Sequence, residues 1–251
     1  MQASRMPVVT CMRTQSDTFA IGTSRHTASI HPHERNAMNQ HKLILPPRLG
    51  LRMWWMSLGI LMMGLSLSVL IRLELGTEPY SCFILGFSRQ LHTSYGNAQL
   101  IAQVLLFLVV IFFGRNRIGI GTIANMVCIG YITDLGNLAL DALVPGSTWL
   151  LPVVRFGALV PAMAVFVLGA ALYMAVDLGV SPYDAVPFIL SEKLKKVSFR
   201  PVRMIWDFTF MMLGFLLGGS MGLVTLLGML FLGPVIAWLQ KKMEPSLHKT
   251  P

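Results

Sequence analysis

Seven polar or ionisable side chains stand in or beside long apolar segments of this chain, where burying them is expensive. A polar group inside a bilayer needs a partner, so residues of this kind are candidates for binding a solute. Tyrosine adds a rigid aromatic face and a hydroxyl that suit a partly apolar solute. The candidate solute-binding residues are Glu78, Tyr80, Asn125, Asp134, Tyr183, Asp184 and Asp207. Because Asp134 and Asp207 lie deepest in their segments, we expect them to couple solute movement to protons or Na⁺.

Each kind of candidate also has a structural explanation. Asp184 could lie among lipid headgroups, Asp134 and Asp207 could pair with a neighbouring helix, and the two tyrosines could be interfacial anchors. The sequence Gly119-Ile-Gly-Thr122 could offer N–H groups to an anion, or form a tight turn with a threonine cap.

Neither an enzyme nor a metal or cofactor site is predicted. The sequence contains no H-E-x-x-H, G-x-S-x-G or G-x-x-x-x-G-K-[ST] motif. Its three cysteines lack C-x-x-C spacing, and we interpret Cys82 and Cys128 as small packing residues.

The elements that must position the candidates are membrane-spanning helices. The chain is 54% hydrophobic and only 12% charged, whereas a soluble domain carries about 25% charged residues. A crossing of the hydrocarbon core takes about 17–25 apolar residues. Six segments qualify, near 53–72, 97–113, 119–140, 153–175, 202–218 and 222–240. The sequence therefore predicts an all-α polytopic protein whose surroundings are the lipid bilayer.

The net charge of +9 reflects membrane topology and does not indicate nucleic-acid binding. With the N-terminus inside, the outer segments hold only Arg72 and Arg89, and Arg155 lies just within the fourth span. The cytoplasmic segments then hold Lys42, Arg48, Arg52, Arg115, Arg117, Lys193, Lys195, Lys196, Arg200, Arg203, Lys241, Lys242 and Lys249. This bias predicts six spans with both termini in the cytoplasm.

The apolar part of the chain is duplicated at an offset of 103 positions. Leu75-Gly76-x-x-Pro79-Tyr80 returns as Leu178-Gly179-x-x-Pro182-Tyr183, and Gly119 and Thr122 return as Gly222 and Thr225. Such a repeat determines the architecture. We expect repeat 1 over residues 42–143 and repeat 2 over 144–242, followed by a cytoplasmic tail at 243–251.

A short helix should follow each Leu-Gly-x-x-Pro-Tyr break. Ser181 is placed to cap the second one, with Pro182 at its first position and Asp184 two residues later. At about 14 residues such a helix is too short for an easy crossing, so each should be interfacial or re-entrant. With three full spans per half, the two repeats would be inverted relative to each other.

Residues 1–41 differ from the rest, being polar, basic and free of a long apolar run. We expect a disordered leader, because such a segment buries too little surface to fold. Alternatives are an organelle-type transit segment, or translation that starts at Met38.

Four stretches carry a resemblance to the YczE/YyaS/YitT-like group of bacterial integral membrane proteins. They are LELGTEPYSCFILGFSRQL, GRNRIGIGTIANMVCIGYITDLGN, ALYMAVDLGVSPYDAVPFILSEKL and LGGSMGLVTLLGMLFLGPVIAWL. The resemblance covers about residues 50–242 and implies a multi-pass protein of the bacterial cytoplasmic (inner) membrane. It implies no catalytic residue.

These features together favour a transporter or facilitator of a small solute, with its site between the two repeats. The alternative is a non-transporting accessory or regulatory protein that presents its basic cytoplasmic segments to a partner. The pattern predicts neither the solute nor the oligomeric state.

Overall fold

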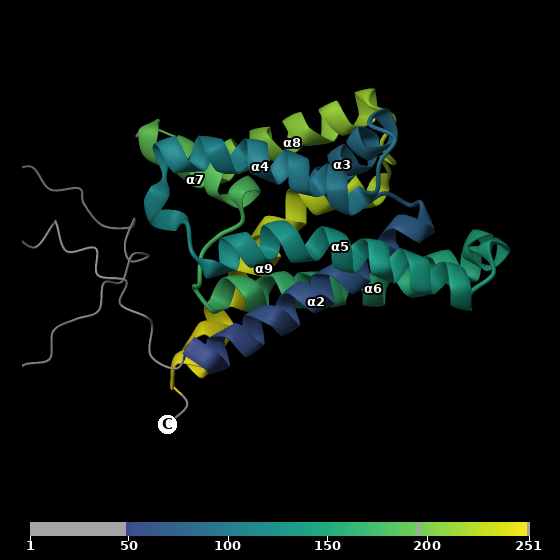
Figure 1. The fold of residues 1–251 in the computed structure, drawn as a ribbon, viewed down its shortest axis with the longest axis horizontal. Coiled ribbons are helices and arrows are strands. Elements are labelled where there is room, and N and C mark those ends of the chain that lie inside the picture. The colour runs from purple at the N-terminus through teal and green to yellow at the C-terminus, as the bar shows by residue number, and fades with distance from the viewer. Residues whose placement is uncertain (1–48, 195–196, 250–251) are drawn as a thin grey trace, which may run out of the picture. The chain divides into compact units, whose positions relative to one another are not determined.

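The computed structural model describes residues 49–194 and 197–249, and these residues form helices joined by short turns, with no strand among them (Figure 1). The leader expected at 1–41 lies outside the described residues. The described α-helices are α2 (Leu49–Leu73), α3 (Pro79–Gln90), α4 (Tyr95–Phe113), α5 (Ile120–Leu143), α6 (Pro152–Ala175), α7 (Pro182–Lys193), α8 (Phe199–Leu216) and α9 (Leu223–Lys249). Two 3₁₀ turns, η1 (Arg115–Arg117) and η2 (Gly146–Leu150), join neighbouring helices. The all-α prediction is confirmed.

Among the described helices, five are long and apolar enough to cross a membrane: α2, α4, α5, α6 and the Val224–Met243 part of α9. The sixth expected segment forms α8, but Arg200, Arg203 and Asp207 make this helix too polar to join the five. The last helix also extends beyond the expected end near 240 and continues to Lys249.

Two groups of helices can be distinguished by their contacts. In the first group, α2 packs against α5 and α6, and α6 packs against α9. In the second group, α3 packs against α8 and α4, and α7 packs against α4 and α8. Figure 1 shows the second group above the first. The main contact between the groups is that of α4 with α5.

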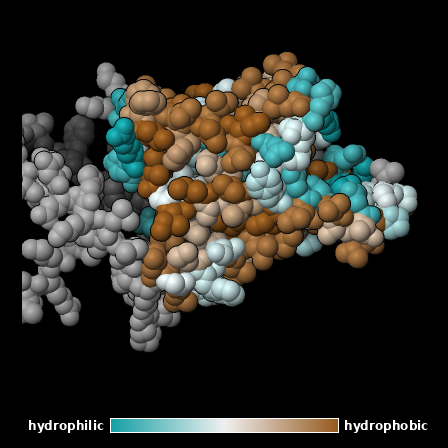
Figure 2. Space-filling model, in the orientation of Figure 1, coloured by the Kyte–Doolittle hydropathy of each residue, from teal (hydrophilic) through white to brown (hydrophobic). Residues whose placement is uncertain are grey.

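Small residues allow the close approach of helices within the first group. A Cβ atom on Gly59 of α2 would lie 2.8 Å from the Gly169 carbonyl oxygen of α6. A Cβ atom on Gly169 would likewise lie 2.8 Å from the Gly59 carbonyl oxygen. Helices in membranes pack through such residues because lipid offers no hydrophobic force to press them together. Figure 2 shows one face of the molecule, on which hydrophobic residues predominate, with more hydrophilic residues toward its two ends.

The two short helices start from the interior and run to opposite ends of α8. The end of α3 meets the end of α8, where the Gln90 side-chain amide donates to the Leu217 carbonyl at 3.3 Å. The end of α7 meets the start of α8, where the Phe188 and Phe199 rings stack with centroids 4.2 Å apart. The expected short helices are therefore present, each 12 residues long.

Each break before a short helix packs against the start of a long helix from the other half of the chain. Gly76 (φ +98°) lies against Thr225 at the start of α9, and Gly179 (φ +116°) lies against Thr122 at the start of α5. Thr122 also accepts a hydrogen bond from the Gly119 N–H at 3.1 Å, which is the threonine cap considered above. Both glycines have the left-handed backbone that side chains disfavour. These contacts hold the N-termini of α3 and α7 in place.

Candidate functional site

A cavity of about 90 Å³ lies between the two helix groups, and every described α-helix or its N-cap residue contributes to its lining. The second group provides a wall made entirely of polar side chains: Glu78, Tyr80, Ser81, Tyr95, Gln99, Gln103, Ser181, Tyr183, Asp184 and Arg203. The first group provides an apolar wall in which Asn125 is the exception: Met63, Leu67, Asn125, Ile129, Phe166, Ala170, Met174, Leu232 and Ile236. The cavity is thus polar on one side and apolar on the other.

Tyr80 and Tyr183 meet at the centre of the polar wall. The two residues occupy equivalent positions at the offset of 103, and their ring centroids are 4.4 Å apart. Phe210 of α8 packs edge-on against Tyr183, with centroids 5.1 Å apart. Each tyrosine is the second residue of its short helix, so the N-termini of α3 and α7 converge here.

Glu78 caps α3 with its side chain. Its carboxylate accepts from the Tyr80 N–H at 2.7 Å and from the Ser81 N–H at 2.9 Å, which would otherwise be unpaired donors at the helix start. The Ser81 hydroxyl also donates to this carboxylate, and its oxygen lies 2.8 Å from the Tyr95 hydroxyl. These contacts join Glu78 to α4.

Ser181 caps α7 as the sequence predicted. Its hydroxyl accepts from the Asp184 N–H at 3.2 Å and donates to the Asp184 carboxylate at 2.7 Å. The expected positions of Pro182 and Asp184 in the first turn are confirmed.

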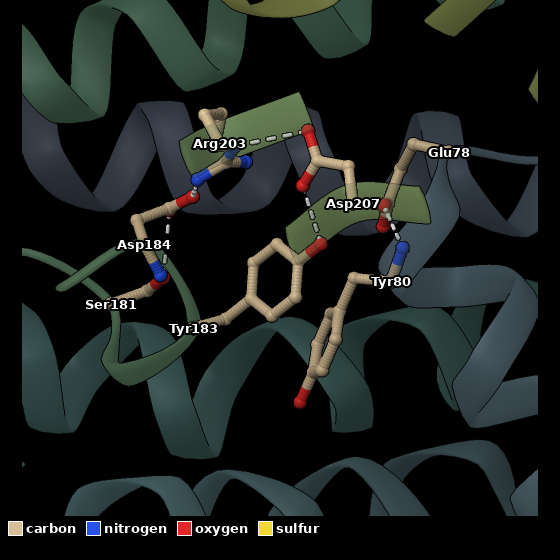
Figure 3. A network of polar contacts seen from close by, with 7 residues as sticks. All are labelled: Glu78, Tyr80, Ser181, Tyr183, Asp184, Arg203 and Asp207. Carbon is tan, nitrogen blue, oxygen red and sulfur yellow. Dashed lines mark hydrogen bonds and ion pairs between the residues drawn. The ribbon is translucent and has the colours of Figure 1, made fainter. Parts of the chain in front are cut away.

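Arg203 of α8 connects the remaining acidic groups (Figure 3). Its guanidinium donates to Asp184 at 2.5 Å and to Asp207, one turn further along α8, at 3.1 Å. The other Asp207 oxygen accepts from the Tyr183 hydroxyl at 2.6 Å. Because a buried charge is costly without partners, this four-residue network holds α7 and α8 in one arrangement.

Four buried side-chain polar atoms in the described part of the chain lack a hydrogen-bond partner within the protein, and three belong to residues that line the cavity. These three atoms are the Tyr80 hydroxyl oxygen and the Oε1 atoms of Gln99 and Gln103. Figure 3 shows the Tyr80 hydroxyl directed away from the charged network. Most buried polar groups in proteins are paired, so three unpaired atoms around one cavity indicate a place for an external partner.

Most of the predicted site residues come together. Glu78, Tyr80, Asn125, Tyr183 and Asp184 line the cavity. Asp207 does not line it, but its carboxylate orients two residues that do.

Asp134 lies apart from this cluster. Its carboxylate accepts from the Gly96 N–H at 2.9 Å and so caps the start of α4, which is a contact with a neighbouring helix of the kind considered above.

Gln99, Gln103 and Arg203 were not among the predicted site residues. Tyr95, Gln99 and Gln103 follow one another at intervals of four, which places them on one face of α4. Arg203 was counted as a cytoplasmic charge, although its spacing of four from Asp207 is that of a helical ion pair. Both signals were present in the sequence.

Among residues 49–194 and 197–249, no three His, Cys, Asp or Glu side chains gather in a way that could hold a metal ion. The site's chemistry consists of hydrogen bonding, charge pairing and aromatic contact.

Comparisons with known proteins place this arrangement in a family. A model described as a family of unknown function, DUF6198, matches residues 50–241. The chain is 23% identical over 171 residues to the uncharacterized protein YyaS of Bacillus subtilis, which covers 68% of this chain and 83% of that protein. It is 26% identical over 177 residues to an uncharacterized protein of Haemophilus influenzae, covering 69% and 76%. No solved structure matches the chain.

Proposed function

The chain belongs to the DUF6198 family, whose function is unknown, and from this premise we propose that it transports or facilitates the passage of a small solute across a bacterial inner membrane. The observation that carries the proposal is the cavity between the two helix groups, with three unpaired polar atoms on the residues around it. Transporters commonly bind their solute where broken helices meet between two repeats. A bound solute would give these atoms the partners that the protein lacks.

The unlike walls of the cavity support movement of one helix group against the other. Hydrogen bonds and ion pairs hold the polar wall together internally, whereas Asn125 is the one polar lining residue on the facing wall. Among the residues that line the cavity, few directional contacts would therefore break if the polar group moved past the apolar one; the contacts that join the groups, such as the Asp134 cap of α4, lie outside the lining. Such a movement would expose the cavity to each side of the membrane in turn.

The proposed topology has six spans in two inverted repeats, with both termini in the cytoplasm and α8 as the sixth span. It is supported by the reciprocal packing of the two breaks and by the opposite directions of α3 and α7. The charges of α8 fit a span if they face the cavity network, because Arg203 and Asp207 neutralise each other.

An accessory role through the basic segment 193–203 is the less favoured alternative. Arg203, one of the charges that such a role would present to a partner, forms ion pairs with Asp184 and Asp207 at the cavity. Lys193 lies over the Phe113 ring, 3.6 Å from its centroid. A charge engaged within the protein is less available to a partner.

A thermal-shift screen on the purified full-length protein tests the proposal, followed by uptake into proteoliposomes. The screen should cover small amines, amino acids, organic acids, sugars and inorganic ions. Each compound should be tested alone and together with an inorganic ion. A ligand at 100 times its Kd adds about 2.7 kcal/mol to stability if it binds only the folded state. We expect at least one class of compound to raise the Tm of the protein and to accumulate inside proteoliposomes that contain it.

Two tyrosine variants show whether a hit occupies the cavity. Tyr80→Phe removes the unpaired hydroxyl and keeps the ring, so it should fold normally and lose the response. Tyr131→Phe removes an exposed hydroxyl that contacts Asn97, outside the cavity, and should keep the response. If no class binds, or if Tyr80→Phe binds as well as the parent protein, the proposal fails.

A further inference from the structure

The charged groups around the cavity do not cancel. Three carboxylates (Glu78, Asp184 and Asp207) face one guanidinium, that of Arg203. Each helix N-terminus contributes about half a positive charge, and both α3 and α7 begin here. One carboxylate therefore offsets the two helix ends and another offsets Arg203, which leaves about one negative charge.

Part of this excess resides on Glu78, the one carboxylate of the three with no side-chain cation beside it among the described residues. Arg203 pairs with both aspartates, whereas Glu78 makes no ion pair with a described residue and accepts only from neutral N–H and O–H donors. Its carboxylate nevertheless lines the cavity. Glu78 is therefore the group to which a positively charged ligand would add the most stabilisation.

The helix ends cannot serve an anion instead. The first N–H groups of α3 already donate to Glu78, and the Asp184 N–H of α7 donates to Ser181. An anion entering the cavity would have to displace these caps and would approach a carboxylate that no side-chain cation neutralises.

The other lining groups suit a cation that carries N–H donors. The unpaired Oε1 atoms of Gln99 and Gln103, each residue only 2% exposed, are acceptors for such donors. An amide can also turn to present its NH₂ group, so these residues bind polar ligands generally, and the charge on Glu78 selects the sign. The Tyr95 and Phe166 rings in the lining add aromatic surface that attracts cations.

The volume of the cavity suits a small ligand. An apolar cavity of about 150 Å³ holds benzene, which has six heavy atoms, and a water molecule takes about 30 Å³. A cavity of about 90 Å³ therefore takes a ligand with fewer heavy atoms than benzene. Guanidinium and methylammonium are of this size and carry several N–H donors.

We propose that the cavity binds a small organic cation of the ammonium or amidinium type, with Glu78 as its charge partner and Gln99 and Gln103 as hydrogen-bond acceptors. This inference rests on the proposed function, because it names the class of solute that the same site would take.

The test compares probes of equal shape and different charge on the full-length protein. Guanidinium and urea are both planar with four heavy atoms, but only guanidinium is charged; acetate is an anion of the same size, and Na⁺ is a cation without N–H donors. We expect guanidinium or methylammonium, tested at millimolar concentration, to bind with a Kd at least tenfold lower than that of urea, acetate or Na⁺. Calorimetry measures the Kd, and competition for uptake of labelled methylammonium provides a second readout. Equal or tighter binding of urea, acetate or Na⁺ would overturn the inference.

Glu78→Gln should weaken binding of the organic cation at least tenfold, since the amide oxygen can still cap α3 but carries no charge. Glu74→Gln is the matched control, because Glu74 is exposed and its contact with Arg155 is long, at 3.5 Å; it should leave binding unchanged. If Glu78→Gln fails to fold, the ranking of probes on the parent protein still decides. Unchanged binding in a folded Glu78→Gln protein would overturn the role of Glu78.

The results separate this inference from the proposed function. If a neutral or anionic probe binds and Tyr80→Phe abolishes that binding, the cavity is a solute site but not one for cations. If none of these probes binds, this inference fails, and the wider screen described above decides the proposed function.

Discussion

Replacing Gln99 or Gln103 by leucine should stabilise the folded protein and weaken solute binding at the same time. Both side chains are 2% exposed, and the Oε1 atom of each lacks a partner. An unpaired buried polar atom costs about 1–3 kcal/mol, and leucine fills a similar volume without one. The cavity can admit water, which relieves part of this cost. We therefore expect a gain near the lower limit, about 1 kcal/mol for each change.

Thermal unfolding in detergent, followed by tryptophan fluorescence at a fixed scan rate, measures this gain. For a chain of this size 1 kcal/mol corresponds to about 2–4 °C in Tm. Thr133→Val provides a control of opposite sign, because the buried Thr133 hydroxyl donates to the Ile129 carbonyl at 2.9 Å. Its loss should lower the free energy of unfolding by about 1 kcal/mol.

A lower Tm in both glutamine variants, similar to that of Thr133→Val, would show that the amides are bonded within the protein. The inference that they are kept for a solute would then be refuted. It would be refuted equally if the variants were more stable and bound the solute as well as the parent protein does.

Three further predictions concern the frame around the site. Gly119→Ala should lower the free energy of unfolding by about 1–3 kcal/mol, because the new Cβ would lie 2.1 Å from the Leu178 carbonyl oxygen. Gly157→Ala is the control and should leave it unchanged, because the space around Gly157 is open. Equal Tm values for the two variants would contradict the packing of the break. Arg203→Met should cost about 3–5 kcal/mol by leaving two carboxylates unpaired, and a Tm within 2 °C of the parent would argue against the network. Leu91→Cys and Leu194→Cys, both exposed just past the short helices, should react with impermeant maleimide from opposite sides of the membrane once the native cysteines are removed, and labelling from one side would refute the inverted repeats.

Much of the fold follows from local physical chemistry and was therefore predictable. Apolar length determines where the long helices lie, and Pro182 after Ser181 determines where α7 begins. The equivalence of Tyr80 and Tyr183 was visible as a repeat, although the contact between their rings was not. That contact depends on how the two halves pack, which the offset of 103 positions does not specify.

The parts that escaped prediction are those in which one residue has two plausible environments. Arg203 lies near the end of a span, where a charge fits either a cytoplasmic surface or a buried network, and only the positions of Asp184 and Asp207 decide between them. Asp134 shows a second case: its depth suggested coupling, which stays a prediction, and an N–H of α4 lies close enough to use its carboxylate as a cap. Tertiary contacts decide both cases.

The duplication also shows that the two short helices contribute different chemistry to the site. The two halves share Tyr80 and Tyr183, and these two rings meet at the centre of the site. The two halves differ at the helix caps: the N-cap of α3 is the charged Glu78, whereas the equivalent N-cap of α7 is the neutral Ser181. Both residues satisfy a helix start, so capping alone does not require the charge. A carboxylate retained where a hydroxyl would suffice, with no cation beside it among the described residues, is better explained by a ligand than by the fold.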